Sequence, residues 1–163
     1  MLDGLYIRTP SNDHDWSRFE ALNFSTFFAS MPPYEKLTEK QFRKQHKELL
    51  ARYSPRFHSD RGAVLIAAND QHDYLGHNWL GAQTDFFTGA NLPWVFDLTV
   101  MPEFRGQGVG RFLMDDCVFR VRTLGFKMIG LQVMAHNIDA ERFYQRYGFF
   151  PKAHSMVMKL GGS

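Results

Sequence analysis

Three glycines stand at alternate positions, Gly106, Gly108 and Gly110, just after an apolar run that ends at Pro102. A helical pattern follows them without an intervening proline. This order predicts a strand, a glycine-rich turn and the first turn of a helix. The first amides of a helix lack an intrahelical partner and lie at the positive end of the helix dipole, where an anion binds. The stretch Asp97–Arg111 therefore predicts a seat for a phosphorylated ligand.

Two familiar nucleotide-binding loops do not match this stretch. A Walker A loop ends in Gly-Lys-Ser or Gly-Lys-Thr, which the stretch lacks. The dinucleotide fingerprint needs a further glycine where Arg111 stands. The phosphate seat is thus expected to serve another kind of phosphorylated ligand.

The elements that position this turn can be read from caps and apolar runs. A helix opens at Asn12 or Asp13, either of which can cap it, and a capping box at Thr38 and Gln41 opens a second helix that runs to about Tyr53. Further helices are expected over 109–124 and 138–147, and strands over 5–8, 63–68, 74–83, 92–100, 128–134 and 155–160. An antiparallel meander followed by strand–helix–strand crossovers indicates a mixed α/β (α+β) fold.

Length and composition indicate an ordinary globular protein. The chain has 163 residues, of which 44% are hydrophobic and 22% charged. We expect one domain over residues 1–160 and a loose tail over 161–163. The formal charge is only +2, and the basic and acidic residues are interspersed. A nucleic-acid partner is therefore not expected.

The single cysteine and the N-terminus bear on compartment and metal chemistry. Cys117 lies at helical spacing from Leu113 and Val121, which indicates a place in the core, and a lone cysteine permits neither an internal disulfide nor a multi-cysteine metal site. The N-terminus lacks a basic segment followed by an apolar one, and no apolar run approaches the length of a membrane span. We expect a cytoplasmic protein with no metal and no membrane partner.

Two motifs in order resemble the GNAT superfamily of N-acetyltransferases. They are Val100-x-Pro102-x-x-Arg105-Gly106-x-Gly108-x-Gly110 and Asn137-x-x-Ala140-x-x-Phe143-Tyr144-x-x-Tyr147-Gly148-Phe149. The resemblance implies a mostly antiparallel sheet of about six or seven strands with about four helices. It also implies a V-shaped split between the strands near 94–100 and 128–134. The expected activity is acetyl-CoA-dependent N-acyl transfer.

The resemblance assigns residues to the coenzyme. The pyrophosphate of acetyl-CoA would sit on the backbone of the turn, and pantetheine would pair with the strand before it. The residues implied for these contacts are Leu98, Val100, Arg105, Gly106, Gln107, Gly108, Val109, Gly110 and Arg111, with Asn137 and Tyr147 nearby. The Arg105 and Arg111 side chains would either add charge or remain solvated. Asn137 is equally suited to capping the helix that follows it.

The same resemblance implies direct attack of an amine on the thioester, with no covalent enzyme intermediate. Tyr144 matches the tyrosine that protonates the departing thiolate. Asp97 is the only charged residue in 92–100, and alternation places it with Val95 and Thr99. It is a candidate base, directly or through water, and is equally compatible with a purely structural role. His136 is the reserve candidate.

The acceptor is expected to be a primary amine. It should approach from the side of the two N-terminal helices and the middle hairpin, where aromatic residues could line a pocket, among them Trp79, Phe86, Phe87 and Trp94. Small amines, amino acids, aminoglycoside-like molecules and protein N-termini or lysines all fit this description. The alternative function is a non-catalytic acetyl-CoA sensor, and family habit allows a homodimer.

Overall fold

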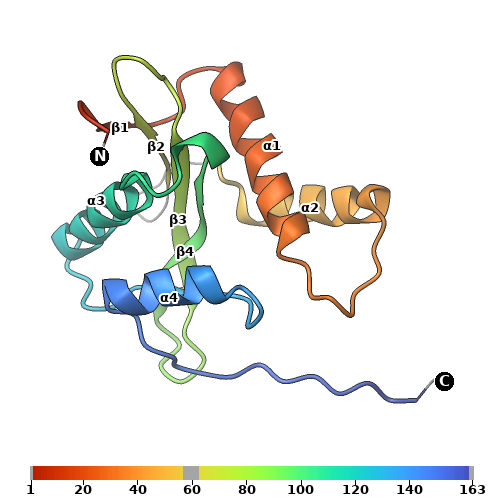
Figure 1. Ribbon diagram of the computed structural model, residues 1–163. Coiled ribbons are helices and arrows are strands. Elements are labelled where there is room, and N and C mark those ends of the chain that lie inside the picture. Colours follow the sequence, from red (N-terminus) through yellow and green to blue (C-terminus); the bar gives the residue numbers. More distant parts are fainter. Residues whose placement is uncertain (1, 57–62, 162–163) are drawn as a thin grey trace. The chain divides into compact units, whose positions relative to one another are not determined.

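The computed structural model describes residues 2–56 and 63–161 (Figure 1). They fall into two compact units, Met1–Gln132 and Val133–Ser163, which are described separately below. The single domain expected over residues 1–160 stays a prediction. No helix in the described ranges is long and apolar enough to cross a membrane.

The first unit is built on an open sheet with strand order β1-β2-β3-β4-β5. The strands are β1 (Tyr6–Arg8), β2 (Ala63–Ala68), β3 (Gly76–Thr84), β4 (Asn91–Val100) and β5 (Gly130–Leu131). Neighbouring strands are antiparallel except β4 and β5, which are parallel. The β3–β4 hairpin carries the longest ladder, from Gly76↔Val100 to Thr84↔Asn91. The predicted mixed, mostly antiparallel sheet is confirmed.

The helices of this unit begin where their caps predict. Asn12 caps α1 (Asp13–Ala29) by accepting a hydrogen bond from the Asp15 amide at 2.9 Å. A capping box of Thr38 and Gln41 opens α2 (Glu39–Tyr53). The short 3₁₀ helix η1 (Pro102–Phe104) follows β4 and leads to α3 (Val109–Thr123).

The helices cover the two faces of the sheet, α1 and α2 on one side and α3 on the other (Figure 1). Trp16 and Phe19 of α1 pack with Val64, Ile66 and Trp79 of the sheet. Ala67 and Leu75 pack with Val109 and Leu113 of α3. Alternate residues of β2 thus enter opposite cores, because side chains alternate across a strand.

Cys117 of α3 is buried with no exposed surface, as its helical spacing predicted. Burial raises the pKa of its thiol to about 12, so the sulfur stays protonated at neutral pH. A protonated, enclosed thiol is a poor nucleophile.

The strand count is lower than predicted. The described residues form five strands rather than six or seven. The strand expected over 128–134 is reduced to Gly130–Leu131, because its ladder with β4 ends beside the boundary between the two units. The strand expected over 155–160 does not form. Its side chains are exposed, and a segment without a ladder neighbour has no partner for its backbone groups.

The second unit contains one helix, α4 (Ile138–Tyr147). Asn137 caps it by accepting from the Ala140 amide at 3.3 Å, and Gly148 ends it at a φ of 120°. Aromatic side chains cluster at its C-terminal end, with ring centroids 5.3 Å apart for Phe143 and Tyr144 and 5.7 Å for Tyr144 and Phe149.

Candidate active site

The predicted strand, turn and helix are present at the end of β4. After η1, the chain passes through Gly106 and Gly108 in the left-handed region, with φ of 72° and 91°, and enters α3 at Val109. Only glycine adopts these angles without strain. The N-cap is Gly108, which has no side chain to cover the first amides of the helix. The turn therefore has the backbone form that an anionic group binds.

Side chains around the turn tie it together and carry positive charge. Arg105 Nε donates to the Val100 carbonyl at 3.1 Å, and Gln107 Nε2 donates to the Glu103 carbonyl at 2.9 Å. Arg111 Nε lies 3.9 Å from an Asp115 carboxylate oxygen, and its side chain is 72% exposed. Both guanidinium groups lie at the surface beside the turn. These residues fit a phosphate-bearing ligand in charge as well as in backbone form.

The edge of β4 opens beside this turn. Only Trp94 and Val95 pair with β5, through Gly130 and Leu131. Within the described chain, the part of β4 that holds Leu98 and Val100 runs past the end of that ladder. The resemblance implied that the two strands part, and the ladder between the described residues likewise stops at Val95 and Leu131.

Asp97 lies at the centre of a buried polar network. Its side chain is 2% exposed. Oδ2 lies 2.6 Å from His77 Nε2 and accepts from Asn23 Nδ2 at 2.6 Å, while Oδ1 accepts from Thr99 Oγ1 at 2.7 Å. Thr26 Oγ1 lies 3.1 Å from Thr99 Oγ1. The network joins β3 and β4 to α1.

The protons on the β3 side can be placed from the chemistry of the groups. Tyr74 Oη lies 2.7 Å from His77 Nδ1. Burial, reinforced by the charge of Asp97, raises the pKa of the Tyr74 phenol far above its usual value. The phenol therefore keeps its proton and is placed to donate it to Nδ1. An imidazole that accepts this bond carries its proton on Nε2 and donates it to the carboxylate.

A second arm runs through α1 to α2. The Asn23 amide nitrogen donates to Asp97, so its oxygen is left to accept from His46 Nε2 at 2.6 Å. His46 is 5% exposed and lies against the rings of Phe24 and Phe42. Burial lowers the pKa of its imidazole, which keeps the ring neutral. Hydrogen-bonded side chains from β3 and from α1 thus meet at Asp97.

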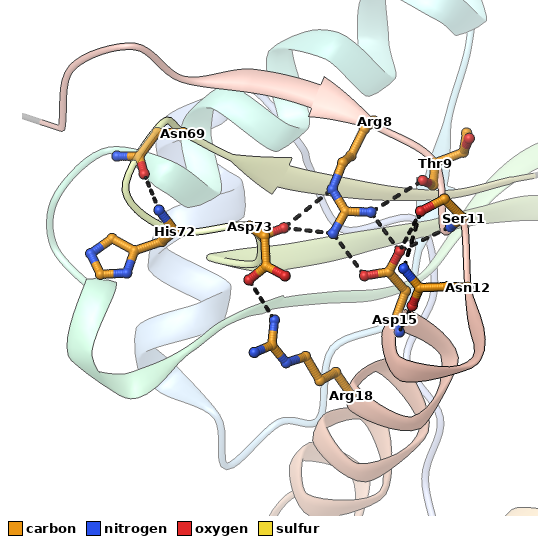
Figure 2. Close-up of polar contacts among 9 residues, drawn as sticks. All are labelled: Arg8, Thr9, Ser11, Asn12, Asp15, Arg18, Asn69, His72 and Asp73. Atoms are coloured by element: carbon orange, nitrogen blue, oxygen red, sulfur yellow. Dashed lines mark hydrogen bonds and ion pairs between the residues drawn. The ribbon is translucent and has the colours of Figure 1, made fainter.

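Arg8 fixes the start of α1 to the sheet (Figure 2). Asn23 lies further along the same helix. The Arg8 guanidinium group donates to both oxygens of Asp15 at 2.6 and 2.7 Å and to the Asp73 carbonyl at 2.6 Å. Asp15 is 1% exposed. The hydrogen bond from Arg8 holds the pKa of this carboxyl at about 2, so the pair is ionised at neutral pH.

The sequence predicts Asp97 as a functional residue. It does not predict the other members of the network, which are His77, Tyr74, Asn23 and His46. Two signals were available. His77 precedes Trp79 at strand spacing in β3, and Asn23 follows Phe19 at helical spacing on the buried stripe of α1. Neither signal shows that the two side chains meet at one carboxylate.

The remaining predicted residues fall in different surroundings. Asn137 serves as the cap of α4, and Tyr144 and Tyr147 belong to its aromatic cluster in the second unit. His136 is exposed. Trp79 is a core residue, whereas Phe86 and Phe87 are 91% and 83% exposed in the β3–β4 turn. These aromatic residues therefore do not gather in one pocket.

Comparison with known proteins agrees with this geometry. A family model described as the acetyltransferase (GNAT) family matches residues 23–149. Mycothiol acetyltransferase from Propionibacterium freudenreichii subsp. shermanii is 32% identical over 90 residues, which cover 55% of this chain and 28% of that protein. An uncharacterized N-acetyltransferase of Bacillus subtilis, YdgE, is 31% identical over 81 residues, half of each chain. The chain spans no more than half the length of these two relatives.

A solved structure is similar over nearly the whole length. The putative acetyl transferase from Pyrococcus furiosus matches with a TM-score of 0.76 at 20% identity, covering 96% of this chain and 99% of that one. This likeness concerns the fold.

Proposed function

Because the chain belongs to the acetyltransferase (GNAT) family, we propose that it moves an acetyl group from acetyl-CoA to a primary amine. The observation that carries the proposal is the turn between β4 and α3. Its left-handed glycines leave the first amides of a helix uncovered beside two arginines. Such a turn suits the pyrophosphate of a coenzyme.

The backbone of residues 106–111 holds the pyrophosphate in this proposal, and Arg105 and Arg111 add charge. The edge of β4 at Leu98 and Val100 receives the pantetheine amides as a neighbouring strand would. An amide of this edge polarises the thioester carbonyl, a contact worth roughly 10² to 10³ in rate in other enzymes. The second family motif likewise assigns Asn137 and Tyr147 to the coenzyme.

Asp97 takes the proton that the acceptor ammonium must lose before it can attack, directly or through a water molecule. A carboxylate offers about four lone-pair positions. Within the described chain Asp97 accepts from His77, Asn23 and Thr99, which leaves one position on Oδ1. That position is the one we assign to the proton of the amine.

Tyr144 supplies the proton on the leaving side. Its phenol protonates the CoA thiolate as the carbon–sulfur bond breaks and the new amide forms. The nitrogen loses its second proton as the amide forms, and this proton restores the Tyr144 phenol through water. The net proton released is the one that Asp97 took from the ammonium. The support for this role is the match of Tyr144 to the second family motif.

A ligand panel tests the donor first. Thermal-shift titrations with acetyl-CoA and CoA should raise the melting temperature, because a ligand that binds only the folded state stabilises it. NAD and ATP serve as controls and should have weaker effects. If neither CoA species stabilises the protein, the proposed donor is wrong.

A thiol-release assay then tests transfer. The amine panel contains small amines, amino acids, an aminoglycoside and peptides with a free N-terminus or lysine. We expect thiol release that depends on at least one of these amines. Binding of acetyl-CoA with no release across the panel would instead indicate a coenzyme sensor.

A further inference from the structure

The surroundings of Asp97 suggest how its free oxygen is aimed. We propose that His77 is a positioning residue that holds the Asp97 carboxylate in one orientation, with the open lone pair on Oδ1 presented to the amine. The inference rests on the proposed role of Asp97 as the base. It adds a residue, and through it Tyr74, that neither motif contains.

The two carboxylate oxygens are not equivalent. Oδ2 is saturated by His77 and Asn23, both at 2.6 Å. Among the described residues, Oδ1 accepts only from Thr99. Because His77 and Asn23 come from a strand and a helix on different sides of the carboxylate, they fix its rotation. The oxygen with spare capacity is then always the same one.

The tautomer of His77 decides whether this arrangement works. With its proton on Nε2, the imidazole donates to Asp97 and stabilises the ionised form. With its proton on Nδ1, it would place a lone pair against the carboxylate, and Asp97 would have to be protonated to satisfy the contact. Tyr74 Oη lies 2.7 Å from Nδ1, and a phenol that donates there selects the first tautomer.

Burial makes the choice between tautomers costly to reverse. His77 has no exposed surface, and Tyr74 is 3% exposed. Water therefore cannot readily replace the phenol as the donor to Nδ1. Phe19 packs against the imidazole at a centroid distance of 4.8 Å and limits its rotation. The two ring nitrogens of His77 therefore stay directed at Tyr74 and Asp97.

Substitutions at His77 separate positioning from packing. His77→Leu removes the donor, and His77→Gln keeps an amide donor directed at the carboxylate. We expect His77→Leu to lower kcat by roughly 10- to 100-fold with the KM for acetyl-CoA nearly unchanged. His77→Gln should recover much of the loss. Asn78→Leu, on the opposite face of β3, is the matched control for a buried substitution and should keep kcat.

Tyr74→Phe provides a milder variant in case His77→Leu does not fold, because it removes one oxygen atom. Nitrogen-15 spectra of the imidazole report the tautomer without any assay of activity. The wild type should carry its His77 proton on Nε2, and Tyr74→Phe should shift both ring signals and lower kcat. An Nδ1-protonated ring in the wild type would overturn the inference.

The variants also distinguish this inference from the role of Asp97 itself. If Asp97→Asn abolishes activity while folded His77→Leu and Tyr74→Phe turn over normally, positioning by His77 is wrong and the base assignment stands. If Asp97→Asn turns over normally, the base assignment fails and the positioning role fails with it. Equal losses in His77→Gln and His77→Leu would point to packing and contradict the inference.

Discussion

His77 Nε2 lies 2.6 Å from Asp97 Oδ2, and the two side chains are 0% and 2% exposed. This contact places an imidazole against a carboxyl group in the interior between β3, β4 and α1. A buried carboxylate is tolerated only when donors satisfy it. The same donors that stabilise Asp97 also decide which of its lone pairs remains open. Structure and chemistry therefore depend on the same few hydrogen bonds.

Asp97→Asn should lower kcat by about 10²-fold or more, since general bases contribute at least that much. The KM for acetyl-CoA should change little, because the glycine turn is untouched. The amide would also set a second N–H donor against His77 or Asn23, so the melting temperature should fall. Asp116→Asn, which breaks only the surface pair with Arg120, is the control. A folded Asp97→Asn variant with normal kcat would exclude the base role.

Gly106→Ala should weaken acetyl-CoA binding roughly tenfold. Holding alanine in the left-handed region costs about 1–2 kcal/mol, and binding would have to restore that conformation. Gly89, in the β3–β4 turn, has a φ of 68°, close to the 72° of Gly106, and a Cβ added at either would meet nothing within 4 Å.

Gly89→Ala is therefore a matched control for Gly106→Ala. It should destabilise the fold by a similar amount and leave the affinity for acetyl-CoA unchanged. Calorimetric titration measures both affinities. Equal affinities for acetyl-CoA in the two variants would mean that the turn does not bind the coenzyme.

Tyr144→Phe should lower kcat by about 10²-fold while the Kd for acetyl-CoA stays near the wild-type value. The substitution removes the phenolic proton and keeps the ring contacts with Phe143 and Phe149. Tyr6→Phe, at an exposed position of β1, controls for loss of a phenol elsewhere. Steady-state kinetics with a saturating amine checks the result, and unchanged turnover would exclude Tyr144 as the acid.

Asp15→Asn should lower the free energy of unfolding at pH 7 by about 2 kcal/mol. The hydrogen bond from Arg8 lowers the pKa of Asp15 to about 2 in the folded state, from 3.8 for an ordinary aspartate. Its contribution is therefore present above about pH 4 and is lost as the pH falls toward 2. The difference between the wild type and the variant should shrink over that range.

Urea unfolding at several pH values measures this difference. Asp73→Asn provides the comparison, because the side-chain pair between Asp73 and Arg18 lies at the surface and contributes little (Figure 2). Similar losses in the two variants would mean that burial of Asp15 adds nothing to its pair with Arg8.

Local signals in the sequence predicted the elements well. The caps at Asn12 and Thr38 and the apolar run of β2 are read over a few residues, and the structure confirms them. Alternation correctly placed Asp97 with Thr99, but not with Val95: the ladder shifts at Phe96, so that Asp97 pairs with Trp79 while Val95 pairs with Leu80, which points to the other face of β3. The strand over 155–160 failed because strand formation needs a neighbour, which a local pattern does not reveal.

The surroundings of Asp97 could not be predicted in the same way. Asn23 precedes it by 74 residues and His77 by 20. Their meeting depends on how α1 packs against the β3–β4 ladder, which no spacing in the chain records. The glycine turn was predictable because its chemistry is contained in one short stretch.

The most direct test of acetyl transfer follows an isotopically labelled acetyl group from acetyl-CoA, with the wild-type protein and the amine panel. We expect the label to appear in an amide of at least one amine, together with an equal amount of free CoA thiol. Binding of acetyl-CoA with no labelled amide and no thiol from any class of amine would contradict it.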